Sequence, residues 1–253
     1  MSWTNFFQSL AELEHDDEFV TGRPGGLSAE LASRIAKDIA EKLELNDSDA
    51  LLDYGSGTGA ITRELASQVA KATAADSSAV IVKRGKASGS HMEWVELGPD
   101  KSPTTGGFTK VLSYYNAHTF ENHSGVRTHI EALSDAVAPG GVVMLGDIPD
   151  LERTGQWKSG ERGREENRTV WMGRLERRGL DIERDERNLA SFTERIKRLG
   201  IEPPASFGDQ HPGFDRDIVT RMFRENGGSV AVVTQPMDFP NAHTCVDYIV
   251  RFG

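Results

Sequence analysis

A short apolar run, a glycine-rich turn and a helical pattern follow one another directly near residue 50. Residues 50–54 (ALLDY) have the length and apolar character of a buried strand, and residues 55–59 (GSGTG) come immediately after them. Residues 61–69 then carry apolar side chains at helical spacing. Glycines let the backbone turn sharply, and they let a ligand lie against main-chain amide groups. The pattern therefore predicts the first strand, turn and helix of an α/β domain, with a ligand site at the turn.

The alternation of strand and helix patterns continues through the first 150 residues of the chain. Further strands are predicted at residues 71–75, 92–97, 108–114 and 142–145, and further helices at residues 27–43, 78–86 and 125–136. Strands that alternate with helices favour a parallel sheet with both faces covered. We therefore predict an α/β fold, a doubly wound Rossmann-like seven-stranded sheet.

The rest of the chain completes this sheet after an interruption. Residues 148–213 are rich in Arg and Glu at helical spacing, and we expect a helical insertion between strands five and six, a candidate lid. A helix at residues 215–225 and strands at residues 229–234 and 244–252 predict a C-terminal antiparallel strand pair. We expect a single domain, 1–253. It begins with an N-terminal helical segment (1–49) and a cofactor-binding core (50–147), and it continues with the insertion (148–213) and the C-terminal helix and strand pair (214–253).

The charge of the chain limits its partners. A total of 39 Asp and Glu against 29 Lys and Arg gives a formal net charge of -10, which repels a phosphate backbone, so we expect no nucleic-acid partner. No apolar run approaches the roughly 18 residues of a membrane-spanning helix, and the acidic first residues are unlike a signal peptide, so we expect a cytoplasmic protein with no membrane span. Cys245 is the single cysteine, which excludes an internal disulfide and a cysteine-ligated zinc cluster.

Two acidic residues accompany the glycine turn. Asp53 comes two residues before the first glycine, where an acid suits a positively charged ligand. Asp76 ends the second predicted strand, where a carboxylate can accept hydrogen bonds from both hydroxyls of a ribose. The glycines alone also fit the G-x-G-x-x-G/A fingerprint of dinucleotide-binding proteins, and the ribose position is common to both interpretations.

Residues 52–59 (LDYGSGTG), together with Asp76, resemble the class I S-adenosylmethionine-dependent methyltransferases. Residues 108–113 and 133–141 resemble the fourth strand of that family and the segment that enters its fifth, so the resemblance covers about residues 27–147 and the C-terminal strand pair. It implies S-adenosylmethionine as the cofactor, with Asp76 at the ribose. The expected contacts of the cofactor are with Asp53, Tyr54, Gly55, Ser56, Gly57, Gly59, Asp76, Ser77 and Ser113.

The chain departs from the family pattern at two positions. The acid that contacts the adenine amino group after the third strand has only Glu96 and Asp100 as candidates, and Thr109 replaces an Asp in the fourth strand. These departures leave backbone groups as an alternative means of recognising adenine. A narrower resemblance, to methyltransferases encoded among bacterial surface-polysaccharide genes, implies a sugar hydroxyl as the methyl acceptor. It is carried by residues 21–28 (TGRPGGLS), 114–120 (YYNAHTF), 146–150 (GDIPD) and 235–240 (QPMDFP).

The acceptor of such a reaction is expected beside the ends of strands four and five, because ligands of open α/β sheets bind outside the carboxyl ends of the strands. Tyr114, Tyr115 and Asn116 are the expected acceptor contacts there. His118 is the first candidate for a general base, since imidazole accepts protons near neutral pH, and Asp147 is the second. The alternative is a structural role: a hydrogen-bonded residue at a helix start for His118, and a turn or helix-cap carboxylate for Asp147.

Three arginines in the insertion, Arg162, Arg164 and Arg168, form either a clamp for a phosphate-linked sugar or a solvated helix surface. No metal is expected, because His118, His123 and His129 are not spaced to share a helical face. The sequence favours methyl transfer to a small molecule, with a hydroxyl of a sugar or sugar-like compound as acceptor. The alternatives are an NAD(P)-dependent oxidoreductase and a non-catalytic cofactor-binding regulatory protein.

Overall fold

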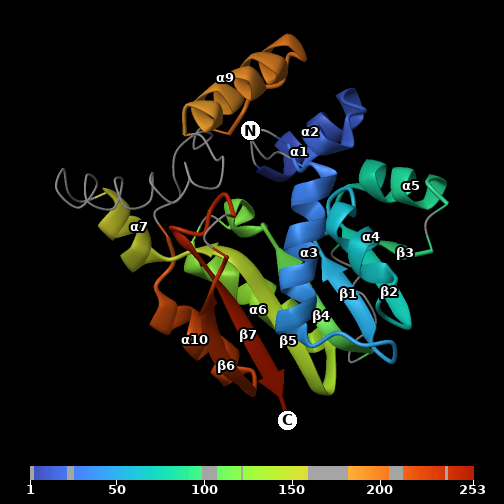
Figure 1. Ribbon diagram of the computed structural model, residues 1–253, viewed down its shortest axis with the longest axis vertical. Coiled ribbons are helices and arrows are strands. Elements are labelled where there is room, and N and C mark those ends of the chain that lie inside the picture. The colour runs from blue at the N-terminus through green and yellow to red at the C-terminus, as the bar shows by residue number, and fades with distance from the viewer. Residues whose placement is uncertain are drawn as a thin grey trace.

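In the computed structural model the strands form one seven-stranded sheet with helices on both of its faces (Figure 1). The structure describes residues 3–21, 26–89, 91–98, 107–120, 122–158, 182–204, 213–236 and 239–253. The strand order is β3-β2-β1-β4-β5-β7-β6. The strands are β1 (Ala50–Tyr54), β2 (Lys71–Asp76), β3 (Glu93–Glu96), β4 (Phe108–Tyr114), β5 (Val137–Pro149), β6 (Gly228–Thr234) and β7 (Cys245–Phe252). Neighbouring strands from β3 to β5 are parallel, whereas β7 is antiparallel to both β5 and β6, which confirms the predicted sheet and its C-terminal strand pair.

The helices begin close to where the sequence patterns place them. They are α1 (Trp3–Leu13), α2 (Asp17–Val20), α3 (Ala29–Leu43), α4 (Ala60–Ala66), α5 (Ala79–Ala87), the short 3-10 helix η1 (Ala117–Thr119), α6 (His123–Ala136), α7 (Leu151–Lys158), α9 (Ile182–Arg198) and α10 (Arg216–Glu225). The Ser28 and Ser78 side chains accept backbone N–H bonds from the first turns of α3 and α5, as N-cap residues do.

Two apolar layers hold the helices to the sheet. On one face α3, α4 and α5 cover side chains such as Leu51 and Ala74, and on the other face α6 and α10 cover Leu52 and Val143. Successive strand residues therefore point to opposite layers, as the pleat of a strand requires. Helices cover both faces of the parallel part of the sheet, so a ligand has access at the carboxyl ends of its strands.

Strand β5 is longer than the predicted segment 142–145. It runs from Val137 to Pro149 because its second half pairs with β7, after a register shift between Leu145 and Ile148. A register shift of this kind marks a bulge, which bends the strand and re-aims side chains. The insertion predicted at residues 148–213 contains the helices α7 and α9 in its described parts, whereas its first two residues belong to β5.

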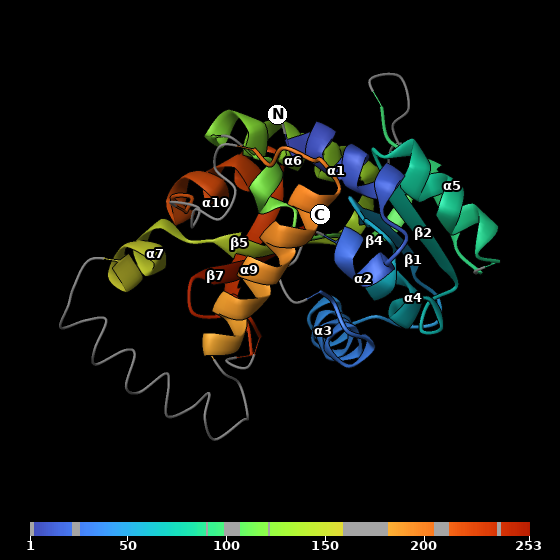
Figure 2. The ribbon, with the colours of Figure 1, turned by 90° about the horizontal axis from the view of Figure 1, so that it is seen from above.

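Helix α9 packs on the two N-terminal helices, α1 and α2, above the sheet (Figures 1 and 2). The contact is apolar, and the rings of Phe19 and Phe192 stack at 4.4 Å between centroids. Arg195 of α9 forms ion pairs with Glu14 at 2.6 Å and Asp16 at 3.0 Å. These three helices thus form a cover, and α1 and α2 contribute side chains to the cavity below. In the part of the chain that the structure describes, no helix combines the length and the apolar character that crossing a membrane requires.

Candidate functional site

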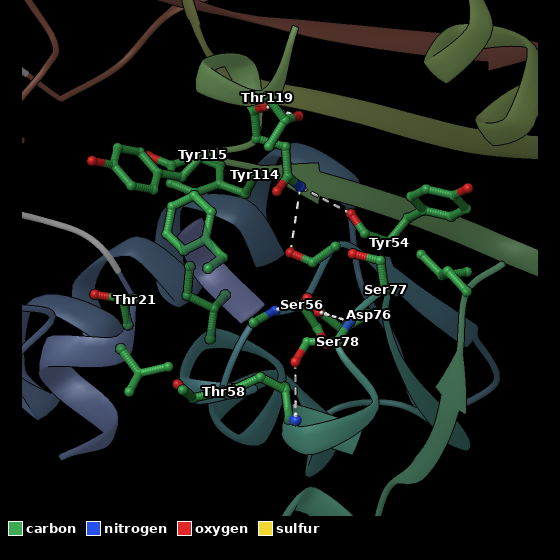
Figure 3. Close-up of a pocket in the computed structure, with 18 of the residues that line it drawn as sticks. Thr21, Tyr54, Ser56, Thr58, Asp76, Ser77, Ser78, Tyr114, Tyr115 and Thr119 are labelled. Atoms are coloured by element: carbon green, nitrogen blue, oxygen red, sulfur yellow. Dashed lines mark hydrogen bonds between the residues drawn. The ribbon is translucent and has the colours of Figure 1, made fainter. Parts of the chain in front are cut away.

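A cavity of about 440 Å³ lies at the carboxyl ends of the parallel strands (Figure 3). Its wall is built by the glycine turn after β1, the ends of β2, β3 and β4, helix η1, and side chains from α1 and α2. Most of the predicted site residues meet here. The wall includes Tyr54, Gly55, Ser56, Gly57, Asp76, Ser77, Tyr114, Tyr115, Asn116 and His118. Asp53, Gly59, Ser113 and Asp147 are not among the lining residues, and Arg162, Arg164 and Arg168 lie outside the described residues.

The glycine turn is tied to the neighbouring strand through its backbone. The N–H groups of Gly55 and Ser56 donate to the Ala75 carbonyl at 2.7 and 2.9 Å. Gly55 has a φ of +80°, and a Cβ at this position would lie 2.5 Å from Nδ2 of Asn116. Gly57 has a φ of +53°, and a Cβ there would meet nothing within 4 Å. The turn is therefore packed against the protein at Gly55 and open to the cavity at Gly57.

Gly59 differs from Gly57 in what lies beside it, and this difference predicts two different effects on stability. Gly59 has a φ of +73°, and a Cβ there would lie 2.8 Å from Cη2 of the buried Trp94. Gly59→Ala therefore combines backbone strain with overpacking and should lower the free energy of unfolding by about 2 kcal/mol or more. Gly57→Ala should cost only about 1 kcal/mol, the strain alone. Urea denaturation of the two variants measures the difference, and equal losses would contradict the assigned contact with Trp94.

Asp76, the last residue of β2, is hydrogen-bonded to the glycine turn. Its Oδ2 accepts the N–H of Gly57 and its Oδ1 accepts the N–H of Ser78, both at 2.8 Å. Burial raises the pKa of Asp76, and the two backbone N–H groups oppose that rise. The carboxylate thus fixes the turn, and it lies on the cavity wall where a hydroxyl of a ligand can reach it.

Asp53 lies in β1 just before the turn and is hydrogen-bonded to the helix that follows it, α4. Its side chain is buried, and the Thr62 hydroxyl donates to its Oδ2 at 2.5 Å. Burial raises the pKa of Asp53 to about 7; the Thr62 hydrogen bond opposes the rise and the charge of Asp76 adds to it. Asp53 is therefore a buried acid that titrates near neutral pH, one layer beneath the cavity wall.

This raised pKa predicts a loss of stability with rising pH. A carboxyl group whose pKa is higher in the folded state stabilises the fold fully below its unfolded pKa of 3.8, and that contribution is lost as pH rises through about 7. Between pH 5 and pH 8, wild type should lose on the order of 2 kcal/mol relative to Asp53→Asn, which keeps an oxygen for Thr62 but does not ionise. Urea denaturation of both proteins at the two pH values measures this. Exposed Asp135→Asn is the matched control, and parallel pH curves for wild type and Asp53→Asn would contradict the shift.

A chain of polar groups runs from Asn116 to His129. The Asn116 Nδ2 donates to the Tyr54 carbonyl and to the Ser113 Oγ, both at 3.0 Å, and the Ser113 Oγ lies 2.8 Å from the His129 Nε2. Ser113 is fully buried behind the wall, whereas His129 reaches the cavity. The sequence interpretation missed His129 as a site residue. A signal was present, because His129 follows Val126 and precedes Ile130 and Leu133 on the buried side of α6.

His118 lies in η1 on the cavity wall, among aromatic rings. Its ring is 4.9 Å from Phe7, 5.3 Å from Trp3 and 5.3 Å from Tyr115, between centroids. Tyr115 has a φ of +61°, which is unusual for a residue other than glycine and is found where neighbouring structure enforces it. The structure therefore brings His118 together with the expected acceptor contacts.

Asp147 does not lie where the sequence interpretation expected it. It is 3% exposed, it lies within the register shift of β5, and it has a φ of +59°. Its Oδ1 accepts from the Gln235 side chain at 3.1 Å and its Oδ2 from the Asn241 side chain at 2.9 Å. Gln235 also donates to the Tyr114 hydroxyl at 3.1 Å. Asp147 thus belongs to a buried hydrogen-bond network that includes Tyr114, and it does not line the cavity as His118 does.

The end of β3 brings no acidic side chain to the described part of the wall. Leu97 and Gly98 line the cavity after β3, whereas Glu96 is not part of the wall and Asp100 lies outside the described residues. Within the described ranges, no three His, Cys, Asp or Glu side chains gather as metal ligands do.

Comparisons with known proteins show which proteins share this fold. No family model matches the sequence. An uncharacterised methyltransferase of Schizosaccharomyces pombe is 36% identical over 59 residues, and the match spans 23% of each protein. The N-methyltransferase NodS of Bradyrhizobium japonicum, in complex with S-adenosyl-L-homocysteine, shares the fold over 98% of both chains, with a TM-score of 0.55 and 18% identity. A TehB-like S-adenosylmethionine-dependent methyltransferase of Corynebacterium glutamicum matches over 99% of this chain and 96% of its own, with a TM-score of 0.51 and 12% identity. The chain therefore has the fold of these methyltransferases.

Proposed function

We propose that this protein binds S-adenosylmethionine in the cavity and transfers its methyl group to a small-molecule acceptor. The observation that carries the proposal is the arrangement of the glycine turn and Asp76. The turn leaves open space at Gly57, and the Asp76 carboxylate lies on the cavity wall beside it. The Ser56 Oγ is buried with no hydrogen-bond partner among the described residues. A buried hydroxyl without a partner is costly, so a polar ligand group beside it is favourable.

The residues present fit this cofactor. Asp76 would accept hydrogen bonds from the ribose hydroxyls, and the turn around Ser56 and Gly57 would hold the methionine end. When ionised, the Asp53 carboxylate behind the turn favours a positively charged group in the cavity. When bound, the cofactor supplies a methyl group on a positively charged sulfur. The protein has to orient the acceptor against that group and exclude water, and orientation alone can supply much of the acceleration.

For the acceptor we propose a hydroxyl of a sugar or sugar-like compound. The short motifs that resemble those of methyltransferases of surface-polysaccharide gene clusters support a sugar, and the aromatic rings of Phe7 and Tyr115 offer apolar faces on which a ring can pack. His118 lies beside both rings and lines the cavity, so its imidazole is the candidate that accepts the hydroxyl proton. A phosphate-linked sugar would in addition require a cation, for which the sequence offers Arg162, Arg164 and Arg168.

Calorimetric titration tests the cofactor directly. We expect S-adenosylhomocysteine to bind and NADH and NADPH not to bind, and the reverse result would make the protein an oxidoreductase candidate. A screen of hydroxyl-bearing acceptors with S-adenosylmethionine, with products detected by mass spectrometry, tests the reaction. Binding without transfer to any acceptor would favour a regulatory protein and contradict the proposed enzyme.

A further inference from the structure

We propose that His129 binds the adenosine part of the cofactor, donating a hydrogen bond from Nδ1–H in a tautomer that Asn116 and Ser113 fix. The inference rests on the proposed function, because it names a residue of the same cofactor site. It concerns a side chain on α6, a helix to which neither the glycine motif nor the family resemblance assigns a cofactor contact.

The direction of the hydrogen bonds follows from Asn116. The atom of its amide that faces the Tyr54 carbonyl at 3.0 Å must be the nitrogen, because a carbonyl oxygen only accepts. The same nitrogen lies 3.0 Å from the Ser113 Oγ and 3.4 Å from the Gly55 carbonyl, and the shorter of these two contacts takes its second hydrogen. Ser113 therefore accepts from Asn116 and has its own single hydrogen left to donate.

That hydrogen goes to His129. The Ser113 Oγ lies 2.8 Å from the His129 Nε2, so Nε2 is the acceptor and carries no proton. A neutral imidazole with an unprotonated Nε2 has its proton on Nδ1. Of the described residues, none provides a hydrogen-bond partner for Nδ1, and His129 lines the cavity. The protein thus holds one imidazole N–H ready for a ligand.

The surroundings of His129 keep it neutral. Its ring packs against Tyr54 at 5.2 Å and Phe120 at 4.8 Å between centroids, and Ser113 contacts it from β4. None of these side chains is charged at neutral pH, and burial lowers the pKa of His129 to about 4. His129 is therefore a hydrogen-bond donor at physiological pH and a poor proton acceptor, which separates its role from that of His118.

The position of Tyr54 indicates which part of the ligand His129 meets. In Figure 3, Tyr54, Ser77 and Asp76 lie on one side of the cavity, and Thr21 and Tyr115 lie on the other. His129 contacts Tyr54 and so belongs to the side of Asp76, the proposed ribose ligand. Ring nitrogens of adenine and oxygens of ribose are acceptors that match an N–H donor. No acidic side chain of β3 lines the wall, so His129 adds an N–H donor beside the Asp76 carboxylate, which only accepts when ionised.

The tautomer is tested in the ligand-free protein by long-range ¹H–¹⁵N NMR of the imidazoles. We expect the His129 signals of a neutral ring protonated at Nδ1, from pH 8 down to pH 6. Ser113→Ala should shift the Nε2 signal, because it removes the donor to that atom. A ring protonated at Nε2 in wild type would overturn the proposal without touching the proposed function.

The ligand contact is tested by calorimetry with S-adenosylhomocysteine and with methylthioadenosine, which keeps the adenosine and lacks the amino acid end. His129→Phe preserves ring packing and removes the donor, and it should weaken both ligands by the same factor, roughly tenfold. His129→Asn should recover part of the loss, because its amide can donate from near Nδ1. Thr128→Ala, an exposed neighbour on α6, is the matched control.

The outcomes separate the two proposals. Unchanged affinity of His129→Phe for methylthioadenosine, with wild type binding it, would overturn the role of His129 and leave the proposed function standing. Wild type that binds neither ligand would overturn both. Equal losses in His129→Phe and Thr128→Ala would indicate a general disturbance of α6 and would also count against the contact.

Discussion

His118→Ala should lower the turnover of methyl transfer by roughly 10²- to 10⁴-fold, the usual contribution of a positioned general base. The imidazole lines the cavity and its ring is close to the rings of Phe7, Trp3 and Tyr115. In Figure 3, Tyr115 lies on the other side of the cavity from Asp76 and Tyr54. Affinity for S-adenosylhomocysteine should therefore stay as in wild type. The acceptor found in the screen is the substrate for this assay, and mass spectrometry quantifies the product.

His91→Ala is the matched control, because His91 is an exposed histidine outside the cavity wall. The variant should keep full turnover. Full turnover of His118→Ala as well would eliminate His118 as the base, and a parallel loss of cofactor affinity would indicate that the substitution has disturbed the packing of α1 instead.

Asp76→Ala should weaken S-adenosylhomocysteine binding by roughly one to two powers of ten, since a hydrogen bond to a charged group contributes about 1.5 to 3 kcal/mol. The substitution removes the proposed ribose acceptor and also frees the N–H groups of Gly57 and Ser78. Both effects act on the same wall of the cavity. Calorimetry measures the affinity, and thermal denaturation reports how much of the loss comes from the fold.

Asp135→Ala controls for the removal of one negative charge, because Asp135 is exposed at the end of α6. Asp76→Asn keeps one oxygen for a backbone N–H and removes the charge, so its loss of affinity should lie between wild type and Asp76→Ala. An Asp76→Ala protein with wild-type affinity would exclude Asp76 as the ribose ligand.

Local patterns predicted the parallel part of the sheet because each of its strands is a short apolar run next to a helix that covers it. The length of β5 was not predictable in this way. Its extension to Pro149 depends on pairing with Cys245 and Val246 of β7, which lie about a hundred residues further along the chain. An expectation that the strand ends at residue 145 places Asp147 just outside it, beside a ligand. The continued pairing with β7 instead places Asp147 within the sheet.

The site residues could be predicted where a short stretch of sequence contains the whole motif. The glycines of residues 55–59 and the acid at the end of β2 meet because a parallel sheet brings neighbouring strand ends together. His129 could not be assigned in this way, since the role proposed for it depends on Ser113 and Asn116, which reach it only through packing of α6 on β4. A polar residue on the buried face of a helix indicates that its side chain has a polar contact, but the sequence does not identify the partner.

Because α9 packs on the first two helices, the N-terminal part of the fold can be completed only late in synthesis. The hydrogen bond between Arg195 and Glu14 joins residues 181 positions apart. At ribosomal speeds of about 5 to 20 residues per second, roughly 10 to 40 seconds separate the emergence of the two partners. During that interval Phe6, Leu10 and Phe19 lack the side chains of α9 that later bury them. Because Phe7 on the same helix lines the cavity, the nascent chain acquires its complete ligand site only after most of its length has been made.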